Sequence, residues 1–139
     1  MLSRVAVGTD GSATAAEAVK AATEMARRFE AELVLLGVFQ DGGGSPGGDD
    51  PELQWASSPS ARLREILERT ENEVRRSGVE CRTLTDEGEP GEVLVRLAES
   101  CGADVLVIGN KGMRRRVLGS VPNTVTHRAS CSVFVVKTT

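Results

Sequence analysis

The sequence predicts an α/β fold built on a parallel sheet, and three observations lead to this prediction. Four short apolar runs are rich in β-branched residues and continuous rather than alternating, which is typical of strands buried on both faces. Stretches with apolar residues at three-and-four spacing lie between these runs and indicate amphipathic helices. Strands and helices therefore alternate, and such helices form right-handed crossovers between parallel strands.

Five segments are predicted to be strands. A weaker run over residues 79–85 alternates more and includes Arg82, a pattern that fits a half-exposed edge strand. The four continuous runs cover residues 5–7, 33–36, 105–108 and 133–136.

Four helical patterns separate these strands. The first has an apolar stripe that ends at Phe29, and either Ser12 or Thr14 can cap its start. Proline is favoured in the first turn of a helix and glycine just after its last turn, and these residues mark the limits of the other three helical patterns. The patterns cover residues 15–29 and 60–76 and begin again at Pro90 and Ser120.

The segment from residue 41 to residue 59 interrupts this regularity. Five glycines between positions 42 and 48 make the segment unfavourable to order. We interpret it as a surface insertion that samples many conformations. The alternative is a lid over a neighbouring site, with Trp55 as its apolar contact.

The length and composition are those of one globular domain over residues 1–139. Lys and Arg total 17 against 20 Asp and Glu, and the net charge of −3 argues against nucleic acid or an anionic membrane as a partner. No apolar run approaches the ~18 residues of a membrane span, and no signal-peptide pattern opens the chain. We therefore expect a soluble, cytoplasmic protein.

The cysteines and the single histidine offer little catalytic chemistry. Cys81, Cys101 and Cys131 lack the spacing of metal ligands, and their odd number suits free thiols in a reducing compartment. Cys81 and Cys101 lie in or beside apolar segments, where cysteine usually acts as a small hydrophobe. Because His127 has no motif around it, we expect neither a metal site nor covalent catalysis.

Alternation alone leaves two strand orders open, the flavodoxin-like order and that of the nucleotide-binding half-fold. In either, the ligand site lies beyond the carboxyl ends of the strands, where the strand order reverses. One segment at such an end is Gly8 to Ser12, whose acid and two hydroxyl groups can bind a polar ligand. Asp10 and Ser12 equally suit helix capping, and from this segment alone capping is the stronger interpretation.

A second segment, residues 109–123, has the composition of a phosphate site. Its glycines let backbone amide groups approach an anion, and Gly119 and Ser120 lead into a helix whose first amide groups are unpaired. The pattern matches neither the Walker motif nor GxGxxG, but its charged residues follow a strand at the edge where ligands bind. These residues are Lys111, Arg114, Arg115 and Arg116.

These two segments resemble the universal stress protein family, and the resemblance covers nearly the whole chain. It lies in Val7 to Ser12, in Ala103 to Gly109 and in the glycines that precede Ser120. The nucleotide-binding branch of the family has the pattern G-x2-G-x9-G-[ST] after such a strand. The resemblance implies a flavodoxin-like, five-stranded parallel sheet with the order 3-2-1-4-5, helices on both faces, and a homodimer through the last strand, Val133 to Val136.

The resemblance also implies a ligand, which is ATP or a related adenine nucleotide, with or without Mg²⁺. The residues that would meet the base and the sugar are Gly8, Thr9, Asp10, Val38, Ile108 and Gly109. The residues that would hold the phosphates are Gly112, Gly119, Ser120, Val121 and Pro122. Six residues separate Gly112 from Gly119 where the family pattern has nine, which shortens the loop by about 10 Å at full extension. We expect Arg114 to Arg116 to compensate by charge.

The favoured function is therefore an adenine-nucleotide-binding sensor or regulator of a stress response, with little or no turnover. One alternative is a slow ATPase, which needs a positioned water molecule and usually a metal held by acids, for which Asp10 is the sole candidate. The other is a dimeric interaction module without a ligand, against which the retained glycines argue.

Overall fold

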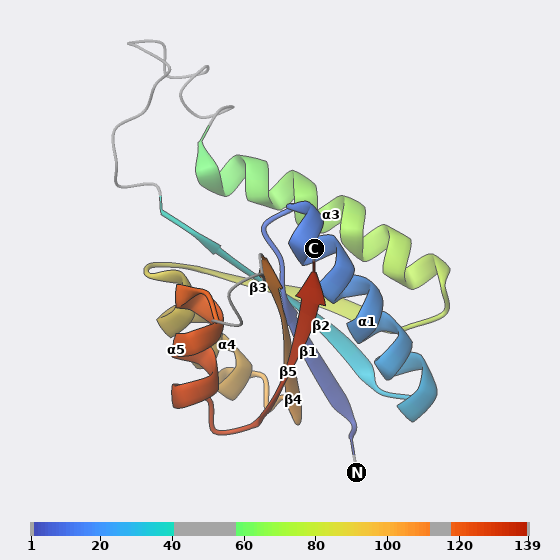
Figure 1. Ribbon diagram of the computed structural model, residues 1–139. Helices are drawn as coiled ribbons and strands as arrows, with labels where there is room; N and C mark the ends of the chain where they lie inside the picture. Colours follow the sequence, from blue (N-terminus) through green and yellow to red (C-terminus); the bar gives the residue numbers. More distant parts are fainter. Residues whose placement is uncertain (1, 41–57, 112–117, 139) are drawn as a thin grey trace.

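The computed structural model describes residues 2–40, 58–111 and 118–138 (Figure 1). Strands and helices alternate along the chain, as predicted. The elements are β1 (Arg4–Gly8), α1 (Ala13–Phe29), β2 (Glu32–Phe39), α3 (Pro59–Arg76), β3 (Cys81–Glu87), α4 (Pro90–Ser100), β4 (Val105–Lys111), α5 (Ser120–Arg128) and β5 (Ser132–Thr138). Most of the glycine-rich segment, with Trp55, lies outside the described residues, so both interpretations of it stay predictions.

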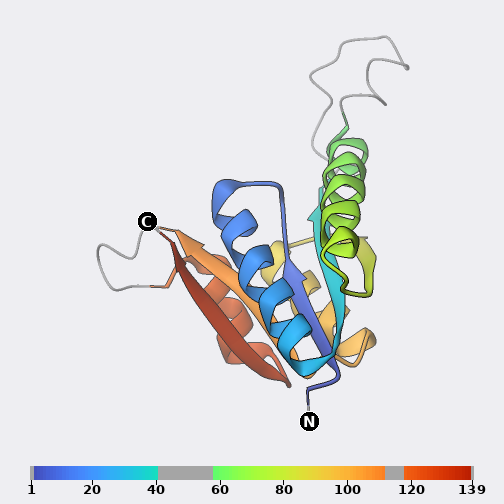
Figure 2. The same ribbon diagram turned by 90° about the vertical axis from the view of Figure 1, so that its right-hand side faces the viewer.

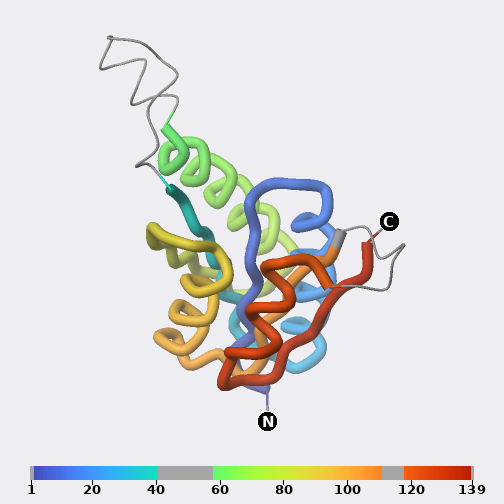
Figure 3. The backbone as a smooth tube through the Cα atoms, turned by 60° about the vertical axis from the view of Figure 1, so that its left-hand side comes forward, coloured from blue at the N-terminus to red at the C-terminus, as the bar shows by residue number. Residues whose placement is uncertain are grey.

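The five strands form one parallel sheet with the order β3-β2-β1-β4-β5. This order confirms the flavodoxin-like alternative and rules out the order of the half-fold. Helices α1 and α3 cover one face of the sheet, and α4 and α5 cover the other (Figures 2 and 3). The order reverses between β1 and β4, and this position is where parallel α/β sheets bind their ligands.

The core consists of two apolar layers, one on each face of the sheet. Leu33 and Leu35 of β2 pack under α1 and α3, whereas Val34 and Leu36 pack under α4 and α5. All four are fully buried, which explains why this strand reads as a continuous apolar run. No helix among the described residues is both long and apolar enough to cross a membrane.

Side chains cap three of the helices. Ser12, Ser58 and Glu89 accept hydrogen bonds from backbone amide groups in the first turns of α1, α3 and α4. Because Ser58 is the cap of α3, the last two residues of the segment 41–59 belong to the start of a helix and not to the loop. The N-cap of α5 is Gly119, which has no side chain with which to cap it.

Helix α1 ends at Phe29 as predicted, but its buried apolar stripe is shorter than predicted. Phe29 continues the apolar stripe of this helix in the sequence, but it is 51% exposed. The helix ends at this residue, and Glu30 takes the left-handed conformation (φ 54°) that turns the chain towards β2. Ala31 enters the core instead, and the last buried residue of α1 is Ala26.

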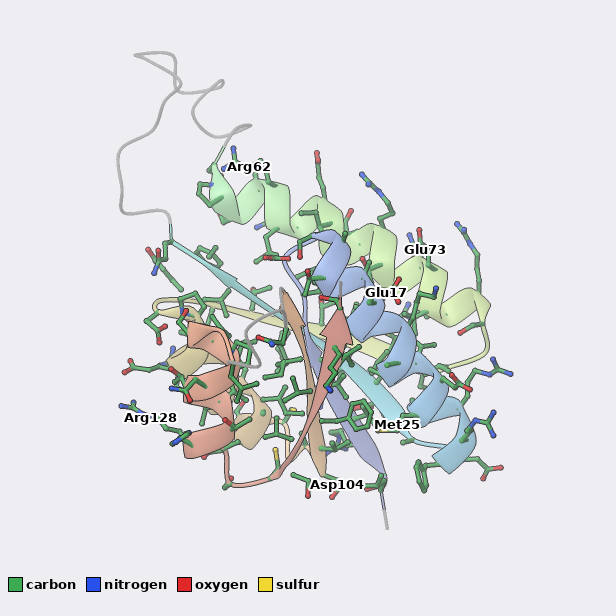
Figure 4. All side chains as sticks on the ribbon, in the orientation of Figure 1. Glu17, Met25, Arg62, Glu73, Asp104 and Arg128 are labelled. Atoms are coloured by element: carbon green, nitrogen blue, oxygen red, sulfur yellow. The ribbon has the colours of Figure 1, made fainter. Side chains whose placement is uncertain are left out.

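Glu32 connects three strands at the amino-terminal edge of the sheet. Its Oε1 accepts hydrogen bonds from Nε of Arg4 on β1 and from Nε of Arg82 on β3, each at 3.0 Å. At the same edge, Asp104 accepts the backbone N–H groups of Ser3 and Arg4 (Figure 4). Burial raises the pKa of the Glu32 carboxyl, but the hydrogen bonds and charges of Arg82 and Arg4 outweigh burial, so this pKa lies below its ordinary value.

We expect Glu32→Gln to lower the free energy of unfolding at pH 7 by about 1 kcal/mol, since it removes the charge from a partly buried pair. A carboxyl whose pKa is lower in the folded state stabilises the fold above its unfolded pKa, and this stabilisation is lost as the pH falls through the folded pKa. Urea unfolding at several pH values should therefore show the two proteins converging below about pH 4.

The control for this experiment is Glu24→Gln, which removes an exposed ion pair with Arg28 on α1. Exposed pairs at this spacing contribute about 0.3–0.5 kcal/mol, so this variant should stay close to the parent protein. If the free energies of unfolding of Glu32→Gln and the parent protein differ by the same amount at neutral and at acidic pH, the lowered pKa of Glu32 is contradicted.

Candidate ligand-binding site

A cleft opens at the carboxyl ends of β1 and β4, where the strand order reverses. Its inner part is a cavity of about 350 Å³ with mostly apolar walls, a volume within the range of small-molecule pockets. The apolar walls come from β2, α4, β4 and α5, and these elements lie far apart in the sequence. The residues of these walls include Leu36, Val38, Leu94, Ile108 and Val121.

The turn between β1 and α1 forms the polar side of this cavity. Oγ1 of Thr9 accepts the N–H of Gly11 at 3.3 Å, and Oδ1 of Asp10 accepts the N–H of Ser12 at 2.9 Å. Ser12 in turn caps α1 by accepting the N–H of Ala15. The capping interpretation is thus confirmed, but Asp10 and Ser12 also line the cleft. Oδ2 of Asp10 makes no hydrogen bond to a described residue, which leaves one carboxylate oxygen for a ligand.

The outer part of the cleft is larger, about 820 Å³, and more polar. Gly119, Ser120 and Pro122 at the start of α5 form one of its walls. Three charged side chains also line it, which are Asp10, Glu17 of α1 and Lys137 of β5. Figure 4 labels Glu17 near the start of α1. The two parts form one continuous cleft, because both are lined by Asp10, Ser12, Thr14, Gly109 and Val121.

The start of α5 offers two backbone donors to the outer part. The N–H of Gly119 donates to Oδ1 of Asn110 at 2.8 Å, and the N–H of Asn123 donates to the carbonyl of Gly119. Pro122 has no N–H group. The amide groups of Ser120 and Val121 have no hydrogen-bond partner among the described residues, and a helix start favours negative charge.

Gly109 and Gly119 differ in the space that surrounds them. A Cβ atom at Gly109 would lie 2.7 Å from Cγ2 and 2.8 Å from the backbone oxygen of Thr14, so the packing of α1 against β4 requires glycine there. At Gly119, the nearest atoms to a Cβ would be Oδ1 of Asn110 at 3.4 Å and Cδ of Pro122 at 3.6 Å. These are ordinary contacts, so the described fold leaves room for a side chain at Gly119.

The structure brings most of the predicted site residues into the cleft. The inner part contains Gly8, Thr9, Asp10, Val38, Ile108, Gly109 and Val121. Gly119, Ser120 and Pro122 lie in the outer part. Gly112, Arg114, Arg115 and Arg116 lie outside the described residues, as does the side chain of Lys111, so their predicted phosphate contacts stay predictions.

Several lining residues were not predicted from the sequence. Pro90 and Leu94 at the start of α4 enter the inner part, although no motif marks them. Asn110, Lys137 and Thr138 at the ends of β4 and β5 enter the outer part. The signal for the last three is a polar residue that follows the apolar run of a strand, but this signal does not tell which of the three is buried.

The cysteines lie away from the cleft. Cys81 and Cys101 are buried in the core, as predicted, and burial raises the pKa of Cys81 to about 12. Burial also raises the pKa values of Cys101 and Cys131, so all three thiols are protonated near neutral pH. In residues 2–40, 58–111 and 118–138, no three His, Cys, Asp or Glu side chains gather as metal ligands do.

The fold and the cleft define a flavodoxin-like α/β protein with a candidate ligand site where the strand order reverses. The chain belongs to the universal stress protein family, whose model matches residues 1–137. A universal stress protein of Mycobacterium tuberculosis is 34% identical over an alignment 143 positions long, which covers 97% of this chain and 96% of that protein. Another, from Methanocaldococcus jannaschii, is 32% identical and matches 96% of this chain and 81% of its own length.

Solved structures of the family share the fold. A universal stress protein solved in complex with cAMP superposes with a TM-score of 0.76 at 29% identity, covering 99% of this chain and 98% of that one. An Arabidopsis thaliana protein of the family, solved with AMP bound, has a TM-score of 0.80 at 23% identity and covers 99% of this chain and 92% of its own. The second likeness bears on the fold alone.

Proposed function

We propose that the cleft binds an adenine nucleotide and that the protein is a sensor or regulator in a stress response. The observation that carries this proposal is the continuous cleft, in which an apolar cavity adjoins a polar compartment at the start of a helix. An adenine ring needs apolar walls, and phosphate groups need backbone amide donors and space. The related protein that was solved with cAMP supports the proposal.

In this proposal the base occupies the inner cavity between Val38 and Leu94, and the sugar lies near the second carboxylate oxygen of Asp10. The first phosphate then reaches the amide groups of Ser120 and Val121. ATP, ADP, AMP and cyclic AMP share these parts, so each is a candidate ligand. Mg²⁺ would accompany the longer phosphate chains.

Calorimetric titration of the purified protein with adenosine and with AMP tests this function. We expect both to bind, and AMP to bind more tightly because only AMP reaches the outer compartment. Failure of both ligands to bind would reject the proposal.

The proposal includes binding with little or no turnover, because fast hydrolysis needs a residue that aligns water and acids that hold a metal. The acids of the described cleft are Asp10 and Glu17. Asp10 accepts the N–H of Ser12 in the turn before α1, and Oε1 of Glu17 lies 3.9 Å from Nζ of Lys20.

We also propose that the protein is cytoplasmic, since free thiols at all three cysteines suit a reducing compartment.

The proposal also includes a homodimer through β5. This strand lies at the edge of the sheet and pairs with β4 alone among the described strands, which leaves backbone groups on its outer side for a second copy. Val133 and Val135 pack against the apolar layer under α4 and α5, whereas Phe134 is 46% exposed. An exposed aromatic side chain on an unpaired edge is typical of a strand that pairs with another copy.

We expect Phe134→Lys to convert the dimer to monomers in sedimentation, because lysine on an edge strand disfavours pairing with another strand. Phe29→Lys is the matched control, since Phe29 is exposed to a similar extent, 51%, but lies at the end of α1. The control should remain a dimer. A dimer that survives Phe134→Lys would place the interface elsewhere.

A further inference from the structure

Asn110 lies at the end of β4 and is only 1% exposed, although it is polar. Its Oδ1 accepts the N–H of Gly119 at 2.8 Å, across nine positions of the sequence. Its carbonyl oxygen accepts the hydroxyl of Thr138 at 3.0 Å, and this hydroxyl is 3.4 Å from Oγ1 of Thr14. One buried network therefore joins the ends of β4 and β5 to the starts of α1 and α5.

The bond to Gly119 is made at the residue that precedes the first turn of α5. Gly119 is the N-cap of this helix and has no side chain that could hold the helix start. A buried acceptor that loses its donor costs about 1–3 kcal/mol, so the bond between Asn110 and Gly119 persists in the folded protein. It brings the two ends of the segment 111–118 together, although this segment is three residues shorter than the family pattern.

The same bond limits which amide groups at the start of α5 remain without a hydrogen-bond partner among the described residues. The N–H of Gly119 is used by Asn110, and Pro122 has none, so Ser120 and Val121 supply the donors at this helix start. Both residues line the outer compartment. They directly follow Gly119, the residue whose N–H Asn110 accepts.

We propose that Asn110 is a positioning residue for the phosphate of the nucleotide, acting through Gly119 on the amide groups of Ser120 and Val121. This inference rests on the proposed function, because it concerns the phosphate end of the same cleft. Asn110 does not contact the ligand in this scheme. It sets the share of the affinity that comes from the phosphate and leaves the share from the base unchanged.

The test compares adenosine and AMP in calorimetry for the parent protein and for Asn110→Ala. We expect Asn110→Ala to weaken AMP binding by about tenfold or more and to change adenosine binding by less than about twofold, since 1.4 kcal/mol is a factor of ten. Thr70→Val is the control, because it also removes one side-chain hydrogen bond, that of the Thr70 hydroxyl to the carbonyl of Ile66 within α3, at a residue that does not line the cleft. The control should keep the preference of the parent protein for AMP.

Amide hydrogen exchange provides a second measurement, which begins with the parent protein. The Gly119 amide should be protected without ligand, and AMP should slow exchange at Ser120 and Val121 while leaving Gly119 unchanged. In Asn110→Asp, which keeps an acceptor oxygen at this position, the Gly119 amide should remain protected.

The outcomes separate this inference from the proposed function. A parent protein that binds neither adenosine nor AMP rejects the proposed function, and the inference with it. A parent protein that prefers AMP, combined with an equal preference in Asn110→Ala, rejects the inference alone. A Gly119 amide that exchanges freely in the ligand-free protein also rejects it, even if Asn110→Ala does not fold.

Discussion

Replacing Gly109 by alanine should destabilise the protein by about 2–3 kcal/mol, the upper part of the range for overpacking. The added Cβ would lie 2.7 Å from Cγ2 and 2.8 Å from the backbone oxygen of Thr14. The side chain of Thr14 can rotate, but its backbone oxygen moves only if the first turn of α1 shifts away from β4. Urea unfolding measures the loss of free energy.

Gly119→Ala is the matched control for this experiment, because the nearest contact of its Cβ would be an ordinary 3.4 Å to Asn110. Gly119 also has an extended conformation (φ −64°, ψ 173°) that alanine adopts freely. We expect its stability to stay within about 0.5 kcal/mol of the parent protein. Equal stability of the two variants would show that α1 does not pack against Gly109 as described.

AMP should bind at least about tenfold more tightly than adenosine, because hydrogen bonds to a charged group contribute about 1.5–3 kcal/mol each and a helix start about 0.3–1 kcal/mol. Gly119→Val should remove most of this gain. Gly119 lines the outer compartment and not the inner cavity, so the two added methyl groups should take space from the phosphate and leave the inner cavity untouched. Adenosine affinity should therefore stay within about twofold of the parent protein.

Calorimetry across adenosine, AMP, ADP and ATP measures these differences. Gly119→Ala has a smaller side chain, so it should keep more of the affinity difference between AMP and adenosine than Gly119→Val does. If Arg114 to Arg116 hold the outer phosphates, ATP gains further affinity over AMP, and this gain fades as salt screens exposed charges. Equal affinity for adenosine and every nucleotide, unchanged by Gly119→Val, would remove the phosphate site from the proposal.

The sequence alone determined the class of fold and most of the cleft. The apolar run from Leu33 to Leu36 is continuous because alternate residues are buried under opposite helical layers. That local property predicted a parallel sheet and thereby placed the ligand site at the carboxyl ends of its strands. Gly8 to Asp10 and Gly119 to Pro122 were predicted from their residue types directly beyond a strand or before a helix.

The tertiary structure decided what depends on contacts between distant segments. Alternation of strands and helices allows two strand orders, and the pairing of β1 with β4 selects one of them. Leu94 enters the inner cavity, and Asn110 accepts the N–H of Gly119, because separate elements meet at these positions. The spacing of apolar residues indicates which face of a helix or strand is apolar, but it does not indicate which residues of another element pack against that face. For this reason the requirement for glycine at position 109, where α1 lies against β4, could be read only from the folded chain.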